Sequence, residues 1–168
     1  MPTLLISLKK KSDGSVTLSC TRPDGSIAWQ KVDSRHARFF PYHDLTHYAV
    51  ESTLGHRRGF YGLIADGWDF SDFSSEWPRG PIPADANPSE LIVGLLDAER
   101  SDNQHGSAAE FNANAASFLS QLGSPALSLV DDRQLAAIRA KMAELFDQWN
   151  ALPSGQSMNL ELVFDSAK

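Results

Sequence analysis

Alternation of apolar and polar residues near both ends of the chain is the feature that most constrains its fold. Three short runs of this kind follow one another within residues 1–33, and a fourth occupies residues 158–165. Strict alternation is typical of a strand with one buried face. Asp13-Gly14 and Asp24-Gly25 separate the first three runs, and Asp-Gly favours a tight hairpin turn because both residues tolerate positive φ. We therefore predict a three-stranded meander and a final strand that pairs with it.

Helical signals dominate residues 40–152, between the predicted strands. Pro41 favours the first turn of a helix that ends at Gly55, and an apolar stretch after it predicts a second, shorter helix. Gly59 and Gly62 in that stretch favour close packing over room for a ligand. Three later helix starts are marked by residues that favour the beginning of a helix: Asn87, Ser107 and Asp131.

The order of strands, helices and strand predicts an α+β fold. We expect a small antiparallel sheet with about five helices packed on one face. A chain of 168 residues suits one domain of ordinary size. Residues 1–168 are therefore interpreted as a single domain, with the meander over 1–33, the helical part over 40–152 and the final strand over 158–165.

Composition argues against several classes of function. Lys and Arg total 15 against 21 Asp and Glu, so the formal net charge is -6, whereas a nonspecific nucleic-acid binder needs a basic face. The apolar opening of the chain is too short to span a membrane. Cys20 is the only cysteine, which excludes an internal disulfide and suits a reducing compartment. We expect a cytoplasmic protein that contacts neither nucleic acid nor a membrane.

The string His43-Asp44-Leu45-Thr46-His47 is the strongest chemical signal in the chain. Residues four apart share one helix face with Cβ atoms about 5–6 Å apart, so His43 and His47 present two imidazoles to one point, as metal ligands do. The string has the shape of the zinc-peptidase motif His-Glu-x-x-His, with Asp44 in place of the glutamate that acts as general base. Because aspartate is shorter, Asp44 is interpreted as either a base or a residue that orients a ligand.

Glu51 continues the same stripe one turn beyond His47. By helix rise it lies about 12 Å from His43, so all three side chains cannot bind one ion. Either both histidines bind the metal with Glu51 behind them, which we prefer, or His47 and Glu51 bind it. A third ligand must come from another element, and the candidates are His36, Asp66, Asp69, Asp72, Glu90 and Asp97.

Two resemblances rest on this region. The stretch Phe40-Pro41-Tyr42-His43-Asp44-Leu45-Thr46-His47-Tyr48-Ala49-Val50-Glu51, followed by Gly59-Phe60-Tyr61-Gly62-Leu63 and Gly67-Trp68, resembles a group of uncharacterised bacterial proteins. A more limited likeness, over about 25 residues, is to the coenzyme Q biosynthesis zinc-protein family, which carries His-Asp-x-x-His on a helix and a glutamate about a dozen residues later. Here that later position is Gly59. The second resemblance implies a divalent metal site.

Three functional hypotheses follow. The first is a protein that binds a divalent metal ion, zinc before others, and acts as a hydrolase or lyase on a small-molecule substrate, with the ion polarising an oxygen or activating water. The second is a noncatalytic module for a small ligand or a protein partner, in which the histidines are structural and aromatic residues from Phe60 to Trp77 line a pocket. The third is metal-free acid–base catalysis by His43 or His47 paired with a carboxylate.

Overall fold

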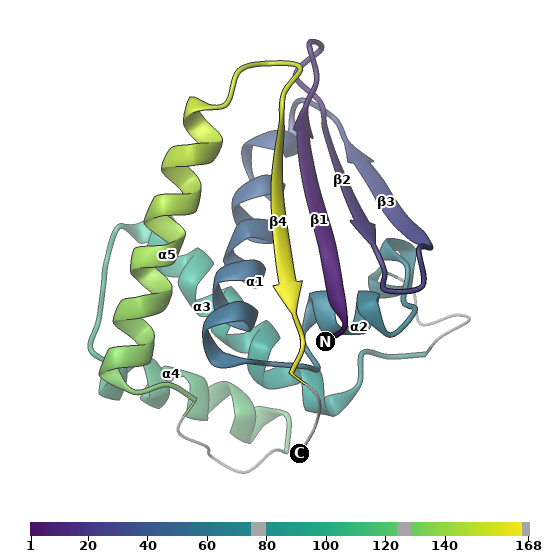
Figure 1. Ribbon diagram of the computed structural model, residues 1–168. Helices are drawn as coiled ribbons and strands as arrows, with labels where there is room; N and C mark the ends of the chain where they lie inside the picture. Colours follow the sequence, from purple (N-terminus) through teal and green to yellow (C-terminus); the bar gives the residue numbers. More distant parts are fainter. Residues whose placement is uncertain (75–79, 124–128, 166–168) are drawn as a thin grey trace.

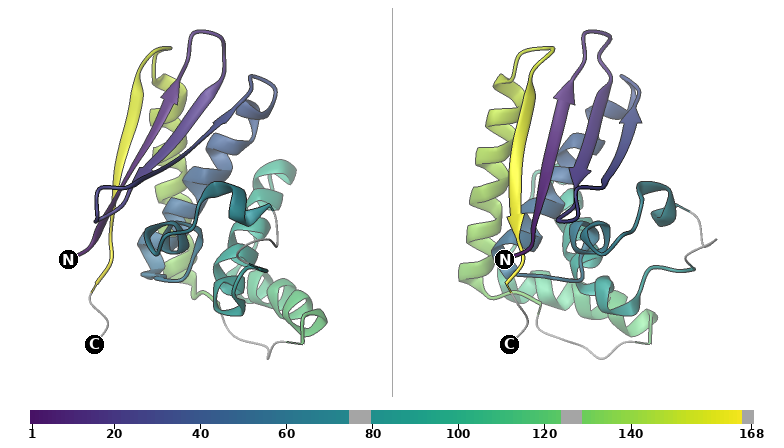
Figure 2. Two further views of the ribbon diagram at one scale, coloured as in Figure 1. Left: turned by 90° about the vertical axis from the view of Figure 1, so that its right-hand side faces the viewer. Right: turned by 45° about the vertical axis from the view of Figure 1, so that its right-hand side comes forward.

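The computed structural model describes residues 1–74, 80–123 and 129–165, and it confirms the α+β architecture. A four-stranded antiparallel sheet forms one layer, and the helices lie on one of its faces (Figures 1 and 2). The strands lie in the order β3-β2-β1-β4, with the bounds β1 Thr3–Lys10, β2 Val16–Thr21, β3 Ile27–Val32 and β4 Ser157–Val163.

The final strand pairs with the meander, as predicted, and its partner there is the first strand. Leu162 lies opposite Leu4 and Met158 lies opposite Leu8 in the antiparallel register of β4 and β1. These four side chains are buried, so the apolar halves of both strands face the helices. Strand β4 starts one residue earlier than predicted and ends at Val163, while the buried Phe164 that follows still bonds to the N-terminal segment.

Five α-helices lie within the described residues, and the predicted capping residues begin two of them. The side chain of Ser107 accepts a hydrogen bond from the backbone N–H of Glu110, and that of Asp131 accepts one from Gln134. None of these helices is both long enough and apolar enough to cross a membrane. Their bounds are α1 Phe40–Leu54, α2 Phe60–Ala65, α3 Asn87–Asp102, α4 Ala108–Gln121 and α5 Asp132–Ala151.

The connection from α2 to α3 contains two short 3-10 helices, η2 (Phe70–Phe73) and η3 (Ala84–Ala86). The ring of Phe60 packs against those of Phe70 and Phe73, with centroids 5.8 and 4.7 Å apart. These rings fill space against one another beside the main core. Trp77, which the pocket hypothesis includes, lies outside the described residues.

Helix α1 is the central helix of the second layer. It packs against both α3 and α5 and faces the inner side of the sheet (Figure 1). Gly55 ends it in the left-handed conformation, at φ 66°, as predicted. Its buried residues include Asp44, His47 and Glu51, and such side chains are seldom fully buried without a partner. The fold therefore places the His-Asp-x-x-His string inside the molecule.

The start of α2 is packed closely at two glycines, against Glu51 of α1 at Gly59 and against the connecting segment at Gly62. A Cβ atom on Gly59 would lie 2.3 Å from Cδ of Glu51, and one on Gly62 would lie 2.0 Å from the backbone oxygen of Arg57. Neither distance is compatible with a side chain. At both positions the structure therefore shows close packing and not space for a ligand, as predicted.

Candidate functional site

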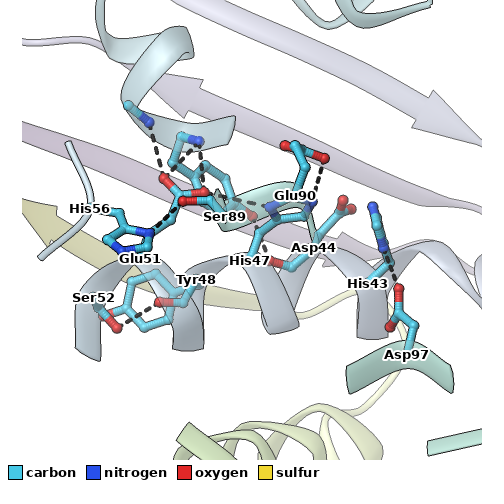
Figure 3. Close-up of polar contacts among 12 residues, drawn as sticks. His43, Asp44, His47, Tyr48, Glu51, Ser52, His56, Ser89, Glu90 and Asp97 are labelled. Atoms are coloured by element: carbon cyan, nitrogen blue, oxygen red, sulfur yellow. Dashed lines mark hydrogen bonds and ion pairs between the residues drawn. The ribbon is translucent and has the colours of Figure 1, made fainter. Parts of the chain in front are cut away.

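The His43 and His47 side chains lie side by side on α1, as the four-residue spacing predicts. Their ring centroids are 4.7 Å apart and their planes are nearly perpendicular, at 87°. His47 is 1% exposed, whereas His43 is 28% exposed. Figure 3 shows the pair together with acidic residues from α1 and α3. The site therefore has one buried histidine and one that solvent can reach.

His43 is held by a carboxylate from a distant part of the chain. Its Nδ1 lies 2.6 Å from Oδ2 of Asp97 on α3. Its other ring nitrogen makes no hydrogen bond to any described residue and points away from Asp97, toward the side where Asp44 lies (Figure 3). Burial alone would lower the pKa of His43, but the hydrogen bond and negative charge of Asp97 outweigh it, so the pKa is raised.

His47 lies between two glutamates. Its Nε2 is 3.9 Å from Oε2 of Glu90 on α3, and its Nδ1 is 3.5 Å from Oε1 of Glu51. That Nδ1 is buried and has no hydrogen-bond partner in the part of the chain that the structure describes. Burial lowers the pKa of His47 to about 4. The imidazole is therefore neutral at pH 7, the form in which histidine binds metals.

Glu51 is completely buried and joins α1 to α2. Its carboxylate accepts hydrogen bonds from the backbone N–H groups of Tyr61, at 3.1 and 3.2 Å, and of Gly62, at 3.2 Å. Burial raises the pKa of Glu51 to about 8, although these backbone bonds act in the opposite direction. Glu51 thus lies next to Nδ1 of His47, and it also fixes the start of α2.

Asp44 lies on the side of α1 that faces the sheet. It is 5% exposed, and its carboxylate makes no hydrogen bond to a described residue. The phenol of Tyr61 donates to its backbone oxygen at 3.0 Å. Burial raises the pKa of the Asp44 carboxyl to about 7. Burial also raises the pKa of the Cys20 thiol, and the nearby negative charge of Asp44 adds to this increase. The Cys20 thiol is therefore unreactive.

The structure separates the six candidates for a third ligand. Glu90 and Asp97 face the two histidines. The other four are engaged elsewhere: His36 with Asp33 at 2.8 Å, Asp66 with Arg58 at 2.8 Å, Asp69 with Arg22 at 2.8 Å, and Asp72 with the backbone N–H of Asp69 at 2.8 Å. Of the six candidates, the two that face the histidines therefore both come from α3.

Asp97 has a second neighbour that stabilises its position. Nη2 of Arg100, one turn later on α3, lies 3.7 Å from Oδ1 of Asp97. The guanidinium of Arg100 also stacks near the rings of Phe39 and Tyr42, at 5.6 and 5.4 Å from their centroids. Asp97 thus lies between the side chains of His43 and Arg100.

The side chains of these residues carry donor atoms of the kinds that bind divalent metal ions, but these atoms do not converge on one point in this conformation. Among residues 1–74, 80–123 and 129–165, no three His, Cys, Asp or Glu side chains have an arrangement that could hold an ion. Two ligands of a tetrahedral zinc lie about 3.3–3.5 Å apart, whereas Nε2 of His47 and Oε2 of Glu90 are 3.9 Å apart. Glu90 is 32% exposed and has a buried oxygen without a partner, so a small side-chain movement is open to it.

Glu90 and Asp97 are among the six candidates named from the sequence, but the sequence does not distinguish them from the other four. Both lie on α3, seven residues apart and therefore on one face of that helix. The polar residues on that face of α3 are the sequence feature that could have indicated its part in the site. Which helix that face meets depends on the packing of α3 against α1, and no local pattern contains that information.

Comparison with protein-family models, with curated proteins and with solved structures gives no match. The functional conclusion therefore rests on the geometry of the site.

Proposed function

We propose that this protein binds a divalent metal ion, zinc before others, through Nε2 of His43, Nε2 of His47 and the carboxylate of Glu90. The observation that carries the proposal is the orientation of the two histidines. Each turns Nδ1 toward a carboxylate, His43 toward Asp97 at 2.6 Å and His47 toward Glu51 at 3.5 Å. Histidines that bind metals place the second nitrogen against a carboxylate in this way, which leaves Nε2 for the ion.

The two supporting acids have distinct tasks in this proposal. Asp97 accepts the Nδ1 proton of His43 and fixes its ring, and the guanidinium of Arg100 lies 3.7 Å from the other oxygen of Asp97. Glu51, whose position the backbone of α2 fixes, stands 3.5 Å behind Nδ1 of His47. These roles correspond to the first of the two arrangements considered from the sequence, in which Glu51 stands behind the ligands.

The reaction class that these residues suit is hydrolysis or elimination on a small molecule. A bound divalent ion would polarise a substrate oxygen or favour deprotonation of water. Asp44 supplies a group that exchanges a proton near neutral pH, because burial raises its pKa to about 7. The partial exposure of His43 and Glu90 gives a substrate access from one side. The free, buried thiol of Cys20 is in keeping with the cytoplasm as the compartment.

Elemental analysis of untagged protein tests the proposal. We expect about one zinc, iron, manganese or nickel ion per wild-type chain, and none in a His43→Ala, His47→Ala double variant that keeps its circular dichroism spectrum. Glu90→Gln should weaken zinc affinity by at least about tenfold. The matched control is His36→Ala, His105→Ala, which removes two exposed histidines that lie beside other acids, Asp33 and Glu99. Absence of metal from wild type, even after reconstitution, would contradict the proposal.

Metal-free acid–base catalysis is a second candidate, and the His43–Asp97 bond favours it. A partly exposed histidine paired at 2.6 Å with a carboxylate that is only 12% exposed has the geometry of a general base and its orienting acid. Its activity would survive a chelator, whereas that of a metal enzyme would not. If the protein neither binds a metal nor catalyses a reaction, the hypothesis left is the noncatalytic module with structural histidines.

A further inference from the structure

A cavity of about 490 Å³ lies at the end of the molecule opposite the chain termini (upper end in Figure 1). The β1–β2 hairpin, the segment before α1 and the end of α5 surround it. Its lining includes Lys11, Arg38, Tyr42, Trp149 and Asn150. None of the functional hypotheses above uses these residues.

The charge of this cavity is opposite to that of the chain. Lys10, Lys11 and Arg38 line it, and no acidic side chain does, although the net charge of the chain is -6. Lys10 is engaged, because its Nζ donates to the backbone oxygens of Trp149 and Leu152 at the end of α5.

Lys11 and Arg38 are the two cations that remain available. Within the described residues, neither makes an ion pair or a side-chain hydrogen bond. The arginines elsewhere that lie near acids are paired with them: Arg22 with Asp69, Arg58 with Asp66 and Asp85, Arg100 with Asp97, and Arg139 with Glu99.

Neutral donors and the ring of Tyr42 complete the cavity. Oδ1 of Asn150 accepts a hydrogen bond from the phenol of Tyr42 at 2.5 Å, so the amide NH2 of Asn150 is left to donate. Ser154 adds a hydroxyl to the lining. The partly exposed ring of Tyr42 lies in the same lining and offers apolar surface, whereas Trp149 is buried beneath Lys10, whose Nζ lies 4.8 Å from the centre of its ring.

We propose that this cavity binds the phosphate group of a small phosphorylated molecule, with Lys11 and Arg38 as the charged contacts. A phosphate monoester carries about -1.5 to -2 at pH 7, which two free cations match, whereas a carboxylate carries only -1. Arginine binds phosphate oxygens in pairs, and lysine binds them as a point charge. Asn150 donates to a remaining oxygen, and the organic part of the ligand packs on Tyr42. A nucleic acid would need a longer basic surface than this one.

The test is a titration of the full chain with phenyl phosphate, followed by NMR of backbone and Trp side-chain signals. We expect saturable shifts at the β1–β2 hairpin and at Trp149, and weaker shifts with inorganic phosphate at equal concentration. A Lys11→Ala, Arg38→Ala double variant should bind phenyl phosphate at least about tenfold more weakly. Benzoate should bind more weakly than phenyl phosphate.

The matched control is Lys9→Ala, Arg35→Ala, which removes the same charge from exposed positions outside the cavity lining. It should bind phenyl phosphate as the wild type does. Equal loss of affinity in both double variants would show a general charge effect and overturn the proposal, as would the absence of saturable binding. Binding to vesicles that contain phosphatidic acid, without binding to phenyl phosphate, would overturn the assignment to a soluble ester.

Discussion

Asp97 on α3 and His43 on α1 are 54 residues apart in sequence, yet their side chains meet at 2.6 Å. This contact joins the two helices that carry the candidate site. It also sets which nitrogen of His43 is free, because Asp97 takes the Nδ1 side of the ring. The acid that orients the exposed histidine therefore comes from α3 and not from the His-Asp-x-x-His string itself.

Replacement of Asp97 by asparagine should lower the pKa of His43. The hydrogen bond and charge of Asp97 raise that pKa above its ordinary value of 6.5. A histidine whose pKa is raised in the folded state contributes stability below its ordinary pKa, and this contribution is lost as the pH rises through the folded pKa. Asp97→Asn should therefore destabilise the protein by about 1–3 kcal/mol at acidic pH and by less at alkaline pH.

Histidine NMR titration and urea unfolding across pH measure both effects. Asp102→Asn is the matched control, because Asp102 is exposed at the end of the same helix. It should leave the His43 titration unchanged. A His43 pKa that is the same in wild type and Asp97→Asn would show that the 2.6 Å contact does not exist in solution.

Replacement of Glu51 by glutamine should change how stability depends on pH. The folded Glu51 carboxyl has a pKa of about 8, whereas its ordinary value is 4.5. Between these values the unfolded chain loses the proton and the folded chain keeps it, so stability falls as the pH rises. Glutamine removes this dependence. The stability of Glu51→Gln relative to wild type should therefore increase from pH 5 to pH 8, by up to about 1.4 kcal/mol per pH unit.

Urea unfolding of both proteins at several pH values provides the measurement. The comparison isolates Glu51, because Asp44 and His47 titrate in both proteins. The exposed Glu144→Gln on α5 is the control, and its stability relative to wild type should not vary with pH in this way. A constant difference between Glu51→Gln and wild type would mean that Glu51 is ionised in the folded protein.

Gly62→Ala should destabilise the protein by about 1–3 kcal/mol or more, because the new methyl group would meet backbone. The added Cβ would lie 2.0 Å from the oxygen of Arg57, and a backbone atom cannot rotate away as a side chain can. Gly94→Ala is the control within a helix, since no atom lies within 4 Å of its added Cβ. That change should stabilise by about 0.5–1 kcal/mol through helix propensity. Urea unfolding that ranks the two variants equally would contradict the close approach of α2.

The sequence by itself determined those features that depend on neighbouring residues. Period-two alternation and the Asp-Gly turns specify the meander, and the capping residues Ser107 and Asp131 specify two helix starts. Helical spacing alone places His43 and His47 on one face of α1. Pairing of the final strand with the meander also followed from the sequence, because an alternating strand needs a partner, whereas the choice of β1 as the edge is seen only in the structure.

Only the tertiary structure decided which acids serve those histidines. Six residues were equally acceptable as a third ligand from the sequence, and the packing of α3 on α1 selects Glu90 and Asp97 while it leaves Asp66 and Asp69 with arginines. The same packing buries Asp44, His47 and Glu51, and burial is the main cause of their shifted pKa values. Contacts between distant segments and loss of water are properties of the assembled core, and no local pattern encodes them.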